Sequence, residues 1–265
     1  MPQDILSQIV ADKRIELAEL RRSMPLEKLR DLAMSSPASS RSMSASLRNS
    51  SSGIIAEFKR RSPSKGWIHE DADPLAIIPS YASSGASALS VLTDLKYFGG
   101  RLDFIRSVRP LVDVPILRKD FIIDEYQLLE ARAAGADAVL LIAACLPEDL
   151  CAELLSEAHA LGLEVLLETH SIEELPYARL GADMVGINNR NLGTFHTDVM
   201  NSFRLSEALK AEAAGCVLVS ESGISDPRTV TDLREKGFRG FLMGENFMKQ
   251  PDPGKALSDF IGKLC

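Results

Sequence analysis

One pattern recurs through the chain: a glycine, a small or polar pair, and then a run of apolar residues. It begins at residues 85, 135, 181 and 237, a spacing of roughly 50 residues, and one further apolar run lies inside each interval. Half of that spacing, roughly 25 residues, is the length of one strand, one helix and two short loops. With a run that follows Gly53, eight strands are expected, at 53–58, 85–92, 114–117, 135–142, 163–167, 181–187, 216–220 and 237–244.

The segments between these runs have helical patterns. Short apolar strands that alternate with helices pair in parallel and are covered on both faces, and eight such units close into a (β/α)8 TIM barrel. An open doubly wound sheet is the alternative, but no expected strand is followed by a G-x-G-x-x-G turn, and nearly every strand ends in polar residues. We therefore predict an α/β barrel with helices at 75–83, 102–108, 125–134, 147–161, 172–179, 203–213, 227–236 and 253–264.

An N-terminal extension precedes the first strand. Apolar residues at helical spacing predict an amphipathic helix over residues 3–22, and a second short helix is expected over 26–34. Residues 35–52 contain ten serines, which is typical of a flexible or partly ordered connector. We expect a helical extension and connector over residues 1–52, followed by one catalytic barrel domain over residues 53–265.

Composition and charge narrow the class of protein. The longest apolar run, residues 138–146, is far shorter than the roughly 20 residues that cross a membrane, and the N-terminus shows no secretory signal. We therefore expect a cytoplasmic protein. A net charge of −7 argues against a nucleic-acid partner, and the four cysteines and four histidines form neither a disulfide framework nor a metal-binding pattern.

The first strand ends in paired charges, in the stretch AEFKRRSPSKG at 56–66. Period-two alternation puts Glu57 and Lys59 on one face, and Ser62-Pro63 ends the strand because proline lacks the ladder N–H. Taken alone, the pair equally fits a solvated ion pair at a strand end. In a closed parallel barrel, however, catalysis takes place at the carboxyl ends of the strands.

Polar residues also stand at the ends of six other expected strands. A lysine among carboxylates stays protonated and acts as a general acid, whereas a desolvated carboxylate acts as a general base. The strand ends therefore predict a proton-transfer site. Its candidates are Glu57 and Lys59, Thr93 and Asp94, Arg118 to Asp120, Glu168, Asn188 and Arg190, Ser220 to Gly223, and Gly244 and Glu245.

The loops after the last two strands, SESGISDP and GFLMGENF, place glycines and hydroxyls directly before helices. Backbone N–H groups at helix starts suit a phosphate, so we predict a phosphate monoester as substrate. The glycines equally fit plain turns, and Ser225-Asp226-Pro227 fits a helix cap. Trp67 and Phe98 suit an apolar wall for an aromatic ring, or the packing of loops on themselves.

Seven motifs occur in order at these strand ends: AEFKRRSPSKG, SVLTDLKYFGG, PILRKDFI, EVLLETH, VGINNRNL, VSESGI and FLMGENFM. With them the chain resembles the indole-3-glycerol-phosphate synthase family over essentially its whole length, N-terminal helices included. The resemblance implies ring closure of 1-(2-carboxyphenylamino)-1-deoxyribulose 5-phosphate to indole-3-glycerol phosphate, with loss of carbon dioxide and water, in tryptophan biosynthesis. It implies no metal or organic cofactor, and a monomer with other tryptophan-pathway enzymes as candidate partners.

Roles follow from the matched positions. Lys119 is similar to the general acid that polarises the substrate carbonyl, and Glu168 to the base of the later dehydration. Lys59 resembles the lysine of the mobile first loop that binds the substrate carboxylate, acting as a second acid or only positioning the substrate. Glu57 and Asn188 correspond to residues that orient the substrate and the lysines, and Arg190 to one that binds substrate and anchors the loop. The implied phosphate-binding positions are Ser62, Ser222, Gly223, Gly244 and Glu245, and those of the aromatic pocket are Phe98, Phe121 and Leu140.

Two residues depart from the family pattern. Phe58 stands where the family more often has a smaller aliphatic residue, which bears on packing under the first loop. Glu245 stands where some members place serine. Because its carboxylate would repel a phosphate, we expect its backbone N–H to face the ligand.

Two alternatives stay open. A phosphoribosylanthranilate isomerase would be a neighbouring phosphate-binding barrel, but its typical cysteine is missing from the end of the first strand. A barrel that only binds a phosphorylated ligand or a partner subunit would not require Glu57, Lys59, Lys119 and Glu168 together.

Overall fold

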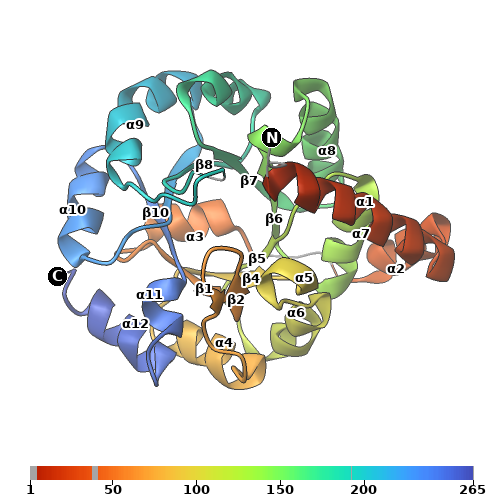
Figure 1. Ribbon diagram of the computed structural model, residues 1–265, viewed down its shortest axis with the longest axis horizontal. Coiled ribbons are helices and arrows are strands. Elements are labelled where there is room, and N and C mark those ends of the chain that lie inside the picture. The colour runs from red at the N-terminus through yellow and green to blue at the C-terminus, as the bar shows by residue number, and fades with distance from the viewer. Residues whose placement is uncertain (1–4, 38–40, 192, 265) are drawn as a thin grey trace.

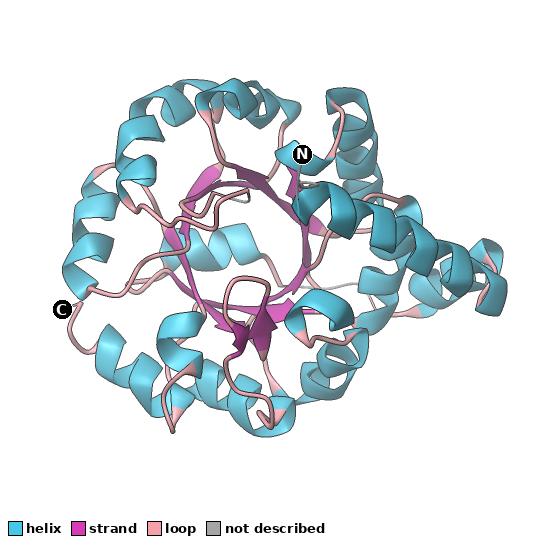
Figure 2. Cartoon of the chain, viewed as in Figure 1, coloured by secondary structure: helices cyan, strands magenta, loops and turns pink. Residues whose placement is uncertain are grey.

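Eight parallel strands form a closed barrel in the computed structural model, which describes residues 5–37, 41–191 and 193–264. Around the barrel the order is β1-β10-β9-β8-β7-β6-β5-β4, and helices surround the strand ring (Figure 2). The (β/α)8 prediction is confirmed, and the open sheet is excluded. The barrel strands are β1 Ile54–Phe58, β4 Ala88–Leu92, β5 Ile116–Lys119, β6 Ala138–Ile142, β7 Glu164–Thr169, β8 Met184–Asn188, β9 Val217–Glu221 and β10 Gly240–Met243.

The connecting helices lie where the sequence predicts them, with one difference of type. Residues 172–180 form a 3-10 helix, η3, with Pro176 inside it. The other helices are α4 Pro74–Ser83, α6 Leu102–Val108, α7 Glu125–Ala134, α8 Glu148–Ala160, α9 Met200–Glu212, α10 Pro227–Glu235 and α12 Pro253–Ile261. Four short helices complete the connections. One follows α6, η1 Arg109–Leu111, and three follow strands: α5 Leu95–Phe98 after β4, η2 Ala143–Cys145 after β6 and α11 Glu245–Met248 after β10.

Alternate strand residues point into the barrel and out toward the helices, as the period of a strand requires. Ile55 belongs to the apolar cluster inside the barrel, whereas Ile54 and Phe58 belong to the cluster between strands and helices. The Phe58 ring packs edge-on against Phe104 of α6, with the centroids 5.8 Å apart. The unusual Phe58 therefore fills the outer layer, and Glu57, its neighbour, points to the other side.

The N-terminal extension contributes helices to both ends of the barrel. In Figure 1, α1 (Ile5–Ser23) crosses the near face, α2 (Leu26–Ser35) follows it and packs on α7, and α3 (Met43–Asn49) lies behind the strand ring. Met43 and Leu47 of α3 are fully buried and join the interior cluster. That β1 begins at Ile54 fits the expected boundary near residue 53, and a division into extension and barrel stays a prediction.

The serine-rich segment is more ordered than the sequence predicts within residues 41–52, and residues 38–40 lie outside the described residues. Ser42 caps α3 by accepting a hydrogen bond from the Ala45 N–H, and the hydroxyls of Ser42 and Ser44 donate to Glu164 at 2.6 and 2.8 Å. Helix α3 was not predicted, because seven residues rich in serine carry no clear periodicity. Its hydroxyls bind the barrel instead of solvent.

A buried lysine fixes α1 on the barrel mouth. The Nζ atom of Lys13, a residue only 2% exposed, lies 2.9 Å from Asp94 Oδ2 after β4, 3.0 Å from Asp120 Oδ1 after β5, and 2.8 Å from Glu16. Burial lowers the pKa of Lys13, but the three carboxylates raise it above its usual value. Burial also raises the pKa of Asp120, while Lys13 and Arg118 lower it to about 2. Both groups are therefore charged at neutral pH.

Replacing Lys13 should destabilise the protein, because Asp94 and Asp120 would be left buried without their shared cation. We expect Lys13→Met to lower the free energy of unfolding by about 3–5 kcal/mol. The exposed Lys28→Met on α2 is the matched control and should cost less than about 0.5 kcal/mol. Urea unfolding at pH 7 measures both, and equal effects of the two substitutions would contradict the assignment.

The same cluster predicts a pH dependence. Because the folded pKa of Asp120 is lowered from 3.8 to about 2, its contribution to stability is present above the higher value and is lost as the pH falls toward the lower one. The stability difference between wild type and Lys13→Met should therefore shrink on acidification across this range. Urea midpoints measured at several pH values test it, and a constant difference would contradict it.

Candidate active site

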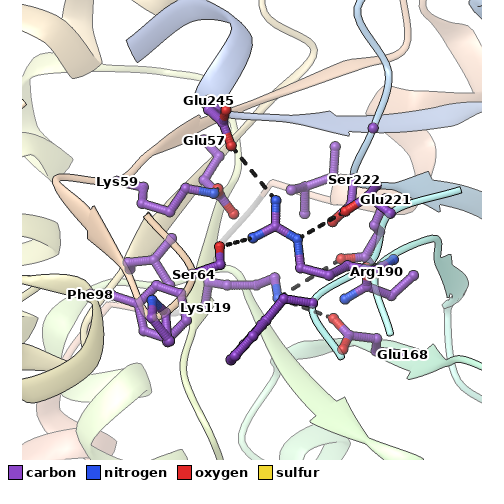
Figure 3. A pocket seen from close by; sticks show the side chains of 18 of the residues that line it. Glu57, Lys59, Ser64, Phe98, Lys119, Glu168, Arg190, Glu221, Ser222 and Glu245 are labelled. Carbon is purple, nitrogen blue, oxygen red and sulfur yellow. Dashed lines mark hydrogen bonds and ion pairs between the residues drawn. The ribbon is translucent and has the colours of Figure 1, made fainter. Parts of the chain in front are cut away.

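A cavity of about 600 Å³ opens at the carboxyl ends of the barrel strands. It lies between the strand ends, helix α1 and the hairpin formed by β2 (Arg61–Ser62) and β3 (Gly66–Trp67). Ten of its lining residues are labelled in Figure 3. Of the predicted site residues, those that line it are Glu57, Lys59, Phe98, Lys119, Asp120, Phe121, Leu140, Glu168, Asn188, Arg190, Glu221, Ser222, Gly223, Gly244 and Glu245.

Lys119 stands among buried carboxylates at the centre of this cavity (Figure 3). Its Nζ atom donates to Glu168 Oε2 at 3.1 Å and lies 3.8 Å from Glu221 Oε2. His170 approaches Glu168 from the other side, with Nε2 3.1 Å from Oε1. That nitrogen has no hydrogen-bond partner in the described residues, so the contact is an ion pair without hydrogen-bond alignment.

The charges of this cluster set unequal proton affinities for the two carboxyl groups. Burial lowers the pKa of Lys119, but Glu168, Glu221 and Glu57 raise it above its usual value. Burial raises the pKa of Glu168, but Lys119 and His170 bring it below its usual range. Burial and the Glu168 charge raise the pKa of Glu221 to about 8. One carboxylate, one carboxylic acid and one ammonium therefore meet at neutral pH, as proton-transfer sites require.

His170 contributes to the difference in pKa between Glu168 and Glu221. Burial lowers the pKa of His170, but Glu168 and Glu174 raise it to about 10, so the imidazole is a cation at neutral pH. Because this second positive charge contacts Glu168 and not Glu221, it favours ionisation of Glu168. His170 was not among the predicted site residues, although it stands two residues after Glu168 in the motif EVLLETH.

Glu57 and Lys59 form an ion pair on the opposite side of the cavity. Glu57 is 4% exposed, so the pair belongs to the site and is not a solvated strand end. Gly244, at the end of β10, leaves room for the Glu57 carboxylate, since a Cβ atom there would overlap Glu57 Oε1. A larger residue at position 244 would therefore displace the Glu57 side chain.

The loop after β9 has a turn conformation that suits an anion. Ser222 and Gly223 both have positive φ, 67° and 80°, and a Cβ atom on Gly223 would meet the Thr197 methyl group. This turn leads toward the start of α10, and backbone N–H groups in turns and at helix starts suit a phosphate. Asp226 caps α10 by accepting from the Arg228 N–H at 2.9 Å, so the helix-cap interpretation holds for Asp226.

An apolar wall faces this polar end. The rings of Phe98 and Phe121 lie 6.1 Å apart, next to Leu140 of β6. Helix α1 completes the wall with Ile5, Leu6 and Ile9, which the sequence analysis did not place in the site. The amphipathic pattern of residues 3–22 shows an apolar face but not what that face covers.

Two residues of the first loop do not line the cavity. Ser62 is buried in β2 and does not line the cavity, where Ser64 stands instead and accepts a hydrogen bond from Arg190 Nη1 at 3.1 Å. Trp67 is 45% exposed, stacks with two arginines of its own loop and also does not line the cavity. For Trp67, the packing of the loop on itself is therefore the correct interpretation.

Arg118 and Asp120, the charged neighbours of Lys119 in the sequence, form ion pairs with helices α7 and α1. Arg118 Nη2 lies 3.1 Å from both Asp120 Oδ2 and Glu130 Oε2 of α7, and Asp120 also pairs with Lys13 of α1. Arg118 does not line the cavity, because successive side chains of a strand point to opposite faces, whereas Asp120 lines it and is paired with Lys13 and Arg118. Thr93 and Asp94 do not line the cavity either, and they contact Asp120 and Lys13.

The fold and the site together define a class: a (β/α)8 barrel with a proton-transfer cluster at the carboxyl ends of its strands. Comparison with known proteins gives the family. Residues 6–260 match the family model described as "Indole-3-glycerol phosphate synthase". The chain therefore belongs to the indole-3-glycerol phosphate synthase family.

Individual relatives agree with this assignment. The chain is 62% identical over 259 residues to an indole-3-glycerol phosphate synthase of Bacteroides thetaiotaomicron, covering 98% of each chain. It is 45% identical over 263 residues to one of Laribacter hongkongensis, covering 96% of this chain and 98% of the relative. A mutant tryptophan synthase alpha-subunit of Pyrococcus furiosus shares the fold, with a TM-score of 0.58 at 16% identity over 80% of this chain and 97% of that one.

The unequal carboxyl pair makes a spectroscopic prediction. Because the pKa of Glu221 is raised to about 8, its carboxyl group should be protonated at pH 7 and should ionise as the pH rises through that value. Infrared difference spectra should show a protonated carboxyl band that disappears on this titration. The band should be missing from Glu221→Gln and present in Glu153→Gln, an exposed change on α8. A band that persists in Glu221→Gln would contradict the assignment.

Proposed function

We propose that this protein catalyses the ring closure of 1-(2-carboxyphenylamino)-1-deoxyribulose 5-phosphate to indole-3-glycerol phosphate, the step of tryptophan biosynthesis for which its family is named. The observation that carries the proposal is Lys119, a protonated lysine 3.1 Å from Glu168 and 3.8 Å from Glu221, inside a cavity with an apolar wall and an anion-binding end. The reaction needs an acid, a base and both of these surfaces.

The cavity suits the charges of the substrate. A phosphate at Gly223 and Gly244 would place the chain of the sugar along the strand ends, toward Lys119. The aromatic ring would then pack on Phe98 and Phe121, and Lys59 would face its carboxylate. Holding the ring carbon against the ketone in this way lowers the entropic part of the barrier.

In the first step, the ring carbon that carries the carboxylate attacks the ketone carbon, and the carbonyl oxygen takes a proton from Lys119. An ammonium at the developing alkoxide stabilises the transition state directly. The carbon–carboxylate bond then breaks, carbon dioxide leaves, and its bonding electrons restore the aromatic ring. In the last step, Glu168 removes a proton from the methylene carbon of the new five-membered ring, while the hydroxyl group on the neighbouring carbon leaves as water with a proton from a lysine.

Product formation tests the reaction itself. Purified protein mixed with the carboxyphenylamino-deoxyribulose phosphate should develop the fluorescence of an indole, and the product should be indole-3-glycerol phosphate by mass spectrometry. A wild-type protein that gives no signal above buffer would leave only the binding-protein interpretation. Conversion of phosphoribosylanthranilate instead would support the isomerase interpretation.

Lys119→Ala should reduce turnover by at least about a thousandfold while substrate still binds, because the acid is lost and most binding groups remain. Lys28→Ala, exposed on α2, is the matched control and should be fully active. Steady-state rates and equilibrium substrate binding measure the two effects separately. Turnover of Lys119→Ala within a factor of ten of wild type would contradict its role.

Glu168→Gln should separate decarboxylation from dehydration. With the base of the last step removed, single-turnover experiments with substrate labelled in the carboxylate should release carbon dioxide faster than indole forms. Wild type and the exposed Glu153→Gln should show no such lag. Equal rates of the two products in Glu168→Gln would contradict the assigned role.

None of the described helices is long and apolar enough to span a membrane. The monomeric state, the cytoplasmic location and any association with other tryptophan-pathway enzymes stay predictions. Light scattering on the purified protein tests the first of these.

A further inference from the structure

Glu245 lies in the phosphate-binding part of the cavity with its side chain, not only its backbone, turned toward cations. Its Oε1 atom accepts a hydrogen bond from Lys65 Nζ at 2.7 Å, and its Oε2 atom lies 3.6 Å from Arg190 Nη2. The second contact is visible in Figure 3. Burial raises the pKa of Glu245, but Lys65, Lys59 and Arg190 lower it below its usual value. The carboxylate is therefore ionised at neutral pH.

Both cations are connected to the tip of the β2–β3 hairpin, one as part of it and the other by a hydrogen bond. Lys65 lies in the turn between the two strands, and Arg190, which follows β8, donates to the Ser64 hydroxyl in the same turn at 3.1 Å. Arg190 is itself oriented by Thr197, whose Oγ1 accepts from Nε at 3.3 Å. Glu245 thus connects β10 to the hairpin through one direct ion pair and through Arg190.

We propose that the Glu245 carboxylate is a resident anion that competes with the substrate phosphate for Lys65 and Arg190. Before substrate binds, the carboxylate gathers the two cations and docks the hairpin tip on the barrel. When a phosphate binds at the loops after β9 and β10, it becomes the partner of both cations. Glu245 is in this sense a positioning residue, and it lowers phosphate affinity while keeping the cations in place.

The proposal resolves the conflict between a carboxylate and a phosphate at one end of the cavity. Two like charges a few ångströms apart repel each other unless cations lie between them. Here an ammonium and a guanidinium surround the carboxylate. The proposal rests on the phosphate site of the proposed function but not on the ring-closure chemistry.

Two substitutions distinguish the effect of the Glu245 charge from that of its side-chain length. Glu245→Gln keeps the shape and removes the charge, so inorganic phosphate should bind roughly five- to tenfold more tightly than to wild type. Glu245→Asp keeps the charge but is one methylene shorter, so phosphate affinity should not rise although the contact with Lys65 is lost. Isothermal titration calorimetry with inorganic phosphate at pH 7.5 measures both, and thermal melts show that the variants fold.

The hairpin provides a second readout that does not depend on turnover. Trp67 is the only tryptophan of the chain and lies on β3, so its emission reports the hairpin directly. Without phosphate, both variants should show emission shifted to the red of wild type, because the docked tip is released. Added phosphate should return Glu245→Gln toward the wild-type spectrum.

The outcomes distinguish this inference from the proposed reaction. Should wild type form indole-3-glycerol phosphate while Glu245→Gln binds phosphate no better than wild type, the inference fails and the reaction stands. Should Glu245→Gln gain phosphate affinity while wild type forms no indole product, the reaction fails and the inference stands. A gain of the same size in Glu245→Asp would also overturn it, because the charge would then not be the cause.

Discussion

The pairing of β1 with both β10 and β4 is the constraint on which the site depends. Ile54 lies opposite Phe241 on one side, and Ile55 lies opposite Ala88 on the other. This closure leaves no barrel strand with an unpaired edge and brings all eight strand ends to one rim. In an open sheet, β1 and β10 would be the two edges, and Glu57 would be far from Gly244.

Closure also decides which charges are buried together. Glu57, Glu168 and Glu221 come from three different strands, and each alone would be costly to bury. Lys119 compensates them as a shared cation, while His170 favours the ionised form of Glu168. The arrangement leaves Glu221 with a raised pKa, so Glu221 is protonated at neutral pH whereas Glu168 is ionised. The chemistry of the site is thus a consequence of how three cations contact three carboxylates: Lys59 pairs with Glu57, Lys119 and His170 contact Glu168, and Glu221 lies 3.8 Å from Lys119.

The fold could be predicted from the sequence because the repeat of strand and helix is regular, and closure follows from eight units. Side chains at the ends of strands could be placed on the correct face where alternation was clear, as for Glu57 and Lys59. Arg118, which does not line the cavity, was misplaced because it directly precedes Lys119 and also carries a positive charge. Ile5, Leu6 and Ile9 could not be placed at all, since contacts between α1 and the barrel mouth depend on long-range ion pairs of Lys13 that no local pattern reveals.

The arrangement of substrate in the cavity is the central claim, and a crystal structure with an unreactive analogue, in which the ketone of the substrate is reduced to an alcohol, tests it most directly. The account predicts the phosphate on the backbone of Gly223 and Gly244, the alcohol oxygen within hydrogen-bonding distance of Lys119, and the aromatic ring between Phe98 and helix α1. A phosphate bound at Lys119, or a ring outside the apolar wall, would contradict it.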